Sequence, residues 1–269
     1  MVAPAYFASM TEKKIPPTAF ITGASSGIGL ELARIFARHG FNLVLLSRNR
    51  AQLHELAASL SGTNAHVIAK DLSHPRAPQE VFEELQEKSI PVDVLVNNAG
   101  FGQHGKFSEI ELETGLEMIQ LNITALTALT RLLLPEMLAR KSGKIMNVAS
   151  TAAFQPGPLM AVYYATKAYV LSFSEAIANE LSGTGVTVTC LAPGATKTDF
   201  ARRASMEDSR LFRMGAADAN SVAEAGFDGL MKGKTLVIPG TRNKILAQSV
   251  RFGPRKLVTA ISRSIQEKR

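Results

Sequence analysis

The sequence predicts an α/β fold, in which one doubly wound parallel sheet of about seven strands is covered by helices on both faces in a single domain. Short apolar runs alternate along the chain with amphipathic stretches, as in parallel strands joined by crossover helices. Most of these runs are continuously apolar, which is typical of strands buried on both faces. The chain has 269 residues, of which 46% are hydrophobic, enough for one large packed domain.

The expected strands and helices alternate in order along the chain. The strands are predicted at 18–23, 41–48, 65–72, 92–100, 143–150, 186–193 and 235–240. Apolar residues at helical spacing predict helices at 29–38, 51–60, 79–88, 121–140 and 160–182. Ligands of such a sheet bind beyond the carboxyl ends of the strands. The residues that follow the strands are therefore the first candidates for a site.

The two ends of the chain differ from its body. We expect residues 1–17 to be a flexible leader rather than a signal peptide, 18–240 to form the domain with a mobile excursion at 199–222, and 241–269 to form a basic helical tail. No window of 18 or more apolar residues predicts a transmembrane helix. The single cysteine, Cys190, lies in an apolar run and is expected to be a buried structural thiol in a cytoplasmic protein.

The net charge of +7 is concentrated in the tail. From residue 232 onward there are ten basic residues and one acid, Glu267, whereas the rest has 20 basic and 22 acidic residues. A nucleic-acid-binding protein needs basic residues across a binding face, which the body does not offer.

A glycine-rich turn follows the first expected strand. The segment TGASSGIG, residues 22–29, leads from strand to helix, and its glycines suit a tight turn that brings the backbone close to a pyrophosphate at a helix N-terminus. It differs from the common G-x-G-x-x-G fingerprint and has no P-loop lysine. The residues expected to contact a dinucleotide here are Gly23, Ser25, Ser26, Gly27, Ile28 and Gly29.

The end of the second expected strand indicates the cofactor. An acid there would favour NAD(H), but the sequence reads LLSRN, with Arg48 and no acid. A guanidinium can pair with a 2′-phosphate, to which Ser25 can add a hydroxyl contact. We therefore expect NADP(H) to be preferred over NAD(H).

Together, TGASSGIG, NNAG (97–100) and YYATK (163–167) resemble the short-chain dehydrogenase/reductase family over roughly residues 18–240. The resemblance implies a Rossmann-type fold and an oxidoreductase. By motif position it implies cofactor contacts at Asp71, Leu72, Asn98, Ala99, Gly100, Pro193, Gly194, Thr196 and Thr198. It also implies that Asn122 holds a water of a proton relay and that Ser150 binds the substrate carbonyl.

Two adjacent tyrosines compete for the role of catalytic acid. The family pairs a tyrosine with a lysine four residues later, and Tyr163 precedes Lys167 by four, whereas Tyr164 would need a lysine at Ala168. Four residues make about one helical turn, so Tyr163 and Lys167 share a face. Tyr164 is then expected to pack or to form a wall of the pocket.

The implied chemistry is hydride transfer between a nicotinamide and a carbonyl or secondary alcohol. Tyr163 would exchange the hydroxyl proton, its pKa lowered by the Lys167 ammonium, and both side chains would also contact the cofactor. Ser150 would stabilise the oxyanion. The alternatives are a 3-oxoacyl thioester reductase and a sensor that binds the cofactor without turnover.

The substrate and partners are less sharply indicated. Mostly apolar pocket candidates favour a lipophilic ketone or a hydroxysteroid-like substrate; they are Phe101, Gln103, His104, Ala152, Phe154, Pro156, Met160 and the 199–222 excursion. The five histidines have no metal-ligand spacing, so no metal is expected. The helices at 121–140 and 160–182 resemble the family's dimer-forming pair and predict a homodimer or homotetramer. The tail predicts a helix docked on the body or a neighbouring subunit, or a weak contact with a membrane surface or acidic partner.

Overall fold

A computed structural model describes residues 16–206 and 215–267. Within these residues the fold is one seven-stranded sheet in the order β3-β2-β1-β4-β5-β6-β9, with every pair parallel. The strands are β1 (Thr18–Thr22), β2 (Asn42–Ser47), β3 (Ala65–Ala69), β4 (Val94–Asn97), β5 (Gly143–Val148), β6 (Val186–Leu191) and β9 (Leu236–Val237). The predicted doubly wound sheet is confirmed, although its last strand is shorter than the predicted 235–240.

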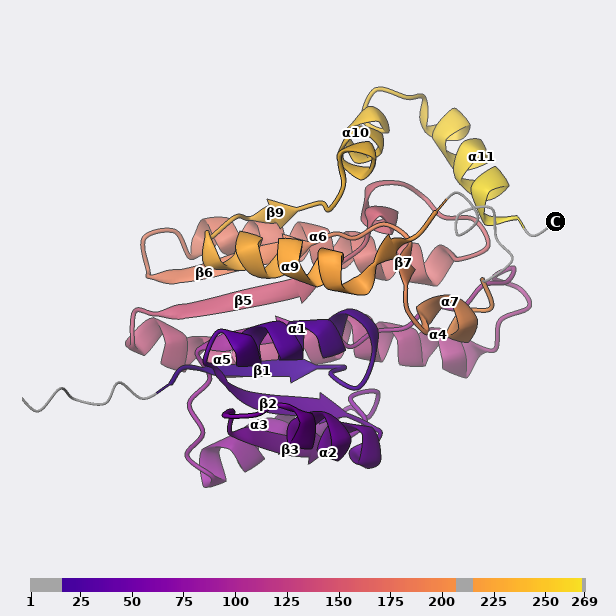
Figure 1. Ribbon diagram of the computed structural model, residues 1–269. Coiled ribbons are helices and arrows are strands. Elements are labelled where there is room, and N and C mark those ends of the chain that lie inside the picture. The colour runs from indigo at the N-terminus through magenta and orange to yellow at the C-terminus, as the bar shows by residue number, and fades with distance from the viewer. Residues whose placement is uncertain (1–15, 207–214, 268–269) are drawn as a thin grey trace, which may run out of the picture.

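Helices cover both faces of the sheet (Figure 1). On one face lie α1 (Gly27–Arg38), α2 (Arg50–Ser59) and α9 (Ala219–Met231), which share a buried cluster with β1, β2 and β4. On the other lie α3 (Ala77–Glu87), α5 (Leu126–Ala139) and α6 (Ala161–Glu180). The five helices predicted from apolar spacing are confirmed to within a few residues at their ends, except for the start of the long one. Apolar burial against the sheet is the main source of stability for such helices.

The long helix before β5 begins earlier than the sequence predicts. It consists of α4 (Leu112–Ile119), a π-helical turn (Gln120–Ala125) and α5. Among the described residues one helix, Leu112–Ala139, is long and apolar enough to cross a membrane, judged by length and composition alone. Leu129, Leu133 and Met137 are buried against the sheet, so we interpret it as a core helix.

The end of the predicted excursion differs from the structure. Residues 219–222, assigned to a mobile excursion, form the first turn of α9, because Asp218 caps that helix by accepting from the Ser221 amide at 3.1 Å. The excursion also contains α7 (Phe200–Arg203) and β8 (Ala217–Asp218), a short strand that pairs in parallel with β7 (Thr196–Lys197). Its residues 207–214, like 1–15 of the predicted leader, lie outside the described residues.

The tail forms two helices, α10 (Thr241–Ser249) and α11 (Arg255–Gln266). They make a hairpin that rises from the end of β9 and turns back over the carboxyl edge of the sheet, in yellow in Figure 1. In this structure α11 docks on the body of its own chain, where Gln266 contacts Tyr164.

Candidate functional site

A cavity of about 1050 Å³ opens at the carboxyl edge of the sheet, where β1 and β4 are neighbours and the strand order reverses. It is large for a ligand site, with room for an extended molecule. Segments after β1, β2, β4, β5 and β6 line it, together with α6, α10 and α11. The predicted site residues that line it are Gly23, Ser25, Ser26, Gly27, Ile28, Arg48, Asp71, Leu72, Asn98, Ala99, Gly100, Ser150, Tyr163, Lys167, Pro193, Gly194, Thr196 and Thr198.

The glycine turn has a backbone that other residues would strain. Gly23 and Gly27 have φ of +67° and +57°. A Cβ on Gly27 would lie 2.9 Å from the Thr198 methyl carbon across the cavity mouth. Ser26 begins α1 without a side-chain cap among the described residues. The first amides of α1 therefore remain available for an anion at the cavity wall.

Gly29, predicted to contact the cofactor, does not line the cavity. It is buried in the first turn of α1, where a Cβ would collide with the Gly23 carbonyl oxygen and the Asn98 amide nitrogen. Asn98 Nδ2 donates to the carbonyl oxygens of Thr22 and Gly23 at 2.9 and 3.2 Å. Gly29 thus acts through packing, because it lets the helix approach the turn closely.

Arg48 and Asp71 face each other at the far end of the cavity. The Arg48 side chain is 73% exposed, and its Nη1 lies 3.6 Å from Asp71 Oδ2. Burial opposes ionisation of Asp71, but hydrogen bonds from the Ser73 amide and hydroxyl, with the Arg48 charge, lower its pKa overall. Because the guanidinium is largely exposed and weakly held, it is free to bind an anion.

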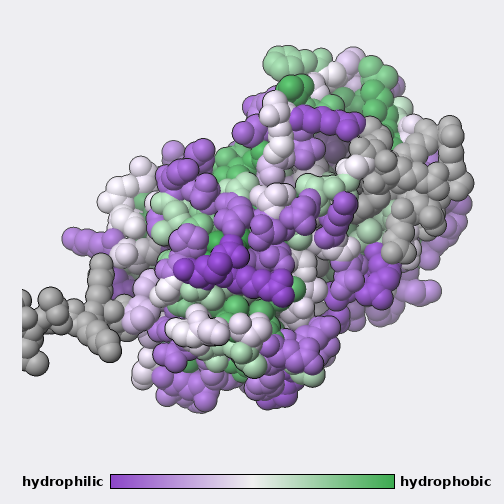
Figure 2. Space-filling model, in the orientation of Figure 1, coloured by the Kyte–Doolittle hydropathy of each residue, from purple (hydrophilic) through white to green (hydrophobic). Residues whose placement is uncertain are grey.

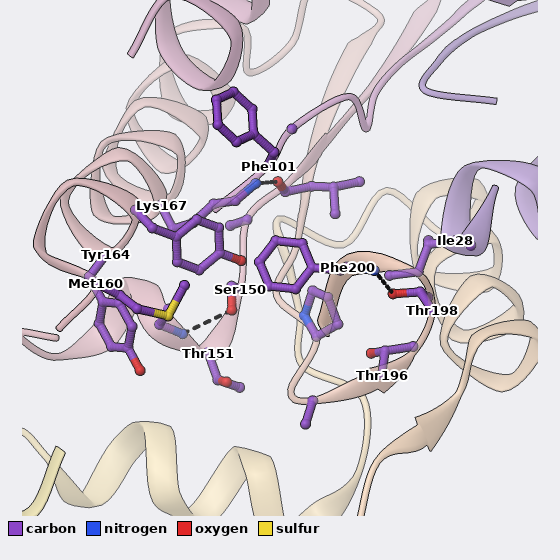
Figure 3. Close-up of a pocket in the computed structure, with 18 of the residues that line it drawn as sticks. Ile28, Phe101, Ser150, Thr151, Met160, Tyr164, Lys167, Thr196, Thr198 and Phe200 are labelled. Atoms are coloured by element: carbon purple, nitrogen blue, oxygen red, sulfur yellow. Dashed lines mark hydrogen bonds between the residues drawn. The ribbon is translucent and has the colours of Figure 1, made fainter. Parts of the chain in front are cut away.

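Ser150, Tyr163 and Lys167 all line the cavity, and Ser150 and Lys167 are labelled on it in Figure 3. Ser150 follows β5, and its Oγ accepts from the Ala152 amide at 3.1 Å and hydrogen-bonds Tyr163. Tyr163 and Lys167 come from one face of α6 and are 8% and 6% exposed. Lys167 Nζ donates to the Val148 carbonyl oxygen at 2.7 Å and lies 5.8 Å from the Tyr163 ring centroid.

Burial controls the protonation of this group. It raises the pKa of Tyr163, an effect that the Ser150 hydrogen bond opposes and the nearby Tyr164 reinforces. Burial also lowers the pKa of Lys167 to about 8. The sequence-based expectation that Lys167 lowers the tyrosine pKa does not hold in this structure, because desolvation of the phenolate is the larger effect.

Asn122 lies behind the cavity wall rather than on it. It sits in the π-helical turn, where its Nδ2 donates to the Phe101 carbonyl oxygen at 2.9 Å and to Thr166 Oγ1 at 3.1 Å. A Cβ added to Gly100 would lie 2.9 Å from Asn122 Oδ1 and 3.5 Å from Lys167 Nζ. Because Gly100 has no side chain, the space near both Asn122 Oδ1 and Lys167 Nζ stays open at that position.

The segment after β6 closes the cavity opposite α6. Thr198 Oγ1 accepts from the Phe200 amide at 3.2 Å, and Thr196 Oγ1 donates to the Gly194 carbonyl oxygen at 2.9 Å. The Phe200 ring packs against Tyr163 with centroids 5.3 Å apart. In Figure 3, Thr196, Thr198 and Phe200 line one side of the space that Ser150 and Lys167 line on the other.

The sequence reasoning missed the wall that the tail provides. Asn243, Leu246, Leu257, Ile261, Ser262, Ile265 and Gln266 all line the cavity. Tyr164, predicted as a packing or wall residue, does both: its hydroxyl accepts from Gln266 Nε2 and hydrogen-bonds Ser262. The sequence predicted a helical tail at 241–269, but it did not predict that this helix lines the cavity.

The pocket candidates divide into three groups. Phe101, Ala152 and Met160 line the main cavity. Gln103 and His104 line a separate cavity of about 370 Å³, because His104 Nε2 turns to donate to the Gln266 carbonyl oxygen at 2.9 Å. Phe154 and Pro156 line neither.

Among the residues that the structure describes there is no cluster of three or more His, Cys, Asp or Glu that could hold a metal. Cys190 is fully buried, and burial raises its pKa to about 12, so it is a structural thiol as predicted.

The chain is similar in sequence and in fold to known proteins of one family. Residues 17–209 match the short chain dehydrogenase family. A short chain dehydrogenase of Pseudocercospora fijiensis is 34% identical over 74% of this chain and 65% of its own length. Among solved structures, a short-chain dehydrogenase from Sphingobium yanoikuyae in complex with NADPH has a TM-score of 0.79 and 34% identity, covering 88% of this chain and 94% of its own. A bulky-bulky ketone specific alcohol dehydrogenase from Comamonas testosteroni has a TM-score of 0.75 and 32% identity, covering 88% and 92%.

Proposed function

The chain belongs to the short-chain dehydrogenase family of oxidoreductases, and we propose that it is an NADP(H)-dependent enzyme that interconverts lipophilic ketones and secondary alcohols. One observation carries the proposal: Ser150, Tyr163 and Lys167 face the same cavity as the glycine turn. A sensor that binds the cofactor without turnover would not need these three side chains beside it.

The cavity suits a nicotinamide dinucleotide along its whole length. The open first turn of α1 and the positive-φ glycines would hold the pyrophosphate. Asp71 and Leu72 would contact the adenosine, and Thr196 and Thr198 the nicotinamide; all four residues line the cavity. When bound, the cofactor supplies the hydride, and the protein supplies orientation and proton transfer.

The protonation states suit carbonyl reduction. Because burial raises the pKa of Tyr163, the phenol is protonated at neutral pH and can donate its proton to a substrate oxygen. Ser150 Oγ accepts from the Ala152 amide, which leaves its own proton for the same oxygen. Lys167 would hold the ribose hydroxyls and stabilise the phenolate that forms. Asn122 would position a water beside Lys167, near Gly100.

Turnover by Tyr163→Phe tests this assignment. NADPH oxidation is measured on a panel of bulky ketones, hydroxysteroid-like ketones and a 3-oxoacyl thioester. Loss of the proton donor should lower kcat by about 10²–10⁴-fold with little change in NADPH affinity. Tyr169→Phe, which removes an exposed hydroxyl from the same helix, should keep wild-type activity. NADPH binding without turnover on any member would favour the sensor, and preference for the thioester would favour the 3-oxoacyl reductase.

The preference for NADP(H) rests on Arg48. Its guanidinium is exposed at the end of β2, and Ser25 lines the same end of the cavity. A 2′-phosphate would form charge-assisted hydrogen bonds with it. Arg48→Ala should lower kcat/KM for NADPH about tenfold, a modest loss because solvent screens the exposed guanidinium. The kcat/KM for NADH should change much less. Equal losses with both cofactors would contradict the assignment.

The substrate class rests on the apolar part of the lining. Phe101, Met160, Tyr164 and Phe200 surround the space next to Ser150, and Leu246, Leu257 and Ile261 extend it under the tail. Apolar surface of this extent favours a bulky, lipophilic ketone. The similarity to an alcohol dehydrogenase specific for bulky-bulky ketones supports this choice.

The proposed assembly is a homodimer or homotetramer of a cytoplasmic enzyme. On the outer side of α6, Tyr169 stacks on Phe173 with centroids 5.6 Å apart and hydrogen-bonds Thr127 of α5 at 3.0 Å. Exposed aromatic residues on paired helices suit a subunit interface. Light scattering tests the proposal, and a monomer mass at micromolar concentration would contradict it.

A further inference from the structure

The hairpin of α10 and α11, residues 241–266, has an unusual number of exposed apolar side chains. Five of the eleven large hydrophobic residues that are exposed among the described residues lie in it: Ile245, Leu246, Phe252, Leu257 and Ile261. Phe252, in the connection between the helices, is 89% exposed. Clusters of this kind mark surfaces that meet a partner or a membrane.

The same hairpin is strongly basic. Its basic residues are Arg242, Lys244, Arg251, Arg255, Lys256 and Arg263, and all of them are exposed, whereas Glu267 is the only acid in 241–267. Counting partners among the described residues alone, only Arg263 of these six has a carboxylate partner, Glu267 at 3.2 Å. Figure 2 shows hydrophobic and hydrophilic residues gathered side by side over α10 and α11 at the top of the molecule.

This combination determines which partner fits. A second copy docked through the same face about a two-fold axis would bring two sets of cations together, which is unfavourable. An anionic bilayer instead offers negative headgroups to the cations and an acyl boundary to Phe252, Ile245 and Leu246. The position also has a consequence, because Leu246, Leu257 and Ile261 line the main cavity as well. Apolar surface is therefore continuous from the hairpin into the cavity.

We propose that the α10–α11 hairpin docks the protein reversibly on anionic lipid bilayers, with Phe252 at the acyl boundary and the basic side chains on the headgroups. A lipophilic substrate dissolved in the bilayer would then reach the cavity past Leu257 and Ile261. This route rests on the proposed function, whereas the docking itself does not.

Sedimentation of the full chain with vesicles tests the docking. The probes are vesicles of phosphatidylcholine alone and of phosphatidylcholine with phosphatidylglycerol, at low and high salt. The protein should sediment with the anionic vesicles at low salt and be released at high salt. Arg251→Glu/Arg255→Glu should weaken binding at least about tenfold, since each basic residue near the surface contributes to attraction. Phe252→Ser should also weaken it.

Matched control variants distinguish binding through the hairpin from effects of the net charge or of exposed apolar side chains elsewhere on the protein. Lys232→Glu/Lys234→Glu makes the same change in net charge at the opposite edge of the sheet, before β9, and should leave binding unchanged. Phe107→Ser removes a phenylalanine that is 73% exposed beside the acidic residues Glu109 and Glu111, and should also leave it unchanged.

Several results would overturn the docking proposal. The first is that the protein fails to sediment with anionic vesicles at low salt, and the second is that it binds both vesicle types equally. The third is that the hairpin variants and the control variants lose vesicle binding to the same extent. Binding to polyglutamate without binding to vesicles would assign the surface to an acidic polypeptide instead. A fall in molecular mass of the hairpin variants would assign it to a subunit interface. None of these measurements uses turnover, so their failure is distinct from failure of the proposed enzymatic function.

Discussion

The substitution Tyr164→Phe should loosen the C-terminal helix α11 from the body. Tyr164 and Gln266 are 7% and 1% exposed, and the tyrosine hydroxyl accepts from Gln266 Nε2. Within the described residues Gln266 Oε1 has no hydrogen-bond partner, so removal of the hydroxyl leaves the whole buried amide of the side chain unpaired. An unpaired buried polar group costs about 1–3 kcal/mol. The equilibrium for opening of α11 should therefore shift by roughly 5- to 160-fold.

Limited trypsin digestion measures this opening. Arg255, Lys256 and Arg263 lie in α11, and cleavage at them follows the population of the open form when reclosing is fast. Mass spectrometry of the products should show faster cleavage at these sites in Tyr164→Phe. The control is Tyr169→Phe, which removes an exposed hydroxyl of α6 that hydrogen-bonds Thr127. This variant should be cleaved at the wild-type rate. Rates for Tyr164→Phe within about twofold of wild type would refute the reasoning.

Three further outcomes concern buried groups. Because burial lowers the pKa of Lys167 from 10.5 to about 8, the unfolded chain binds more protons between these values, and stability rises with pH there. In urea titrations the wild type should gain about 1 kcal/mol over Lys167→Met from pH ~8 to pH ~9, and parallel profiles would contradict this. A Cβ at Gly102 would lie 2.9 Å from Tyr163 Cδ2 and would displace the tyrosine ring. Gly102→Ala should therefore lower kcat at least about tenfold at unchanged NADPH affinity. An unaltered kcat would show that the added methyl group does not displace the ring. Asn147→Ala removes the acceptor of Asn97 Nδ2 at 2.9 Å and should lower the free energy of unfolding by about 1–3 kcal/mol, whereas an unshifted urea midpoint would rule this out.

Much of the architecture could be predicted because its signals are local. Continuous apolar runs indicated strands buried on both faces, and six of them pair in register close to the predicted bounds. Helical geometry alone placed Tyr163 and Lys167 on one face of α6. The positive φ of Gly23 and Gly27 is likewise a property of the turn itself.

The rest depended on contacts between residues far apart in the chain. Gly29 and Asn122 were both predicted to be site residues, yet neither lines the cavity. Gly29 lies behind its wall because α1 packs closely on the turn after β1, and Asn122 because it belongs to the π-helical turn. His104 was predicted to line the main cavity, but its hydrogen bond to the carbonyl oxygen of Gln266, 162 residues away, turns it into the smaller cavity.

The sequence by itself determined the sheet, the glycine turn and the order of Ser150, Tyr163 and Lys167, because each follows from short-range periodicity, turn geometry or motif spacing. Only the tertiary structure decided that α11 closes the cavity through Tyr164 and Gln266. It also decided that Tyr163 is held as a phenol, since its pKa depends on how completely the fold excludes water from the hydroxyl. Helix docking and desolvation are properties of the packed whole, and no local pattern of residues contains them.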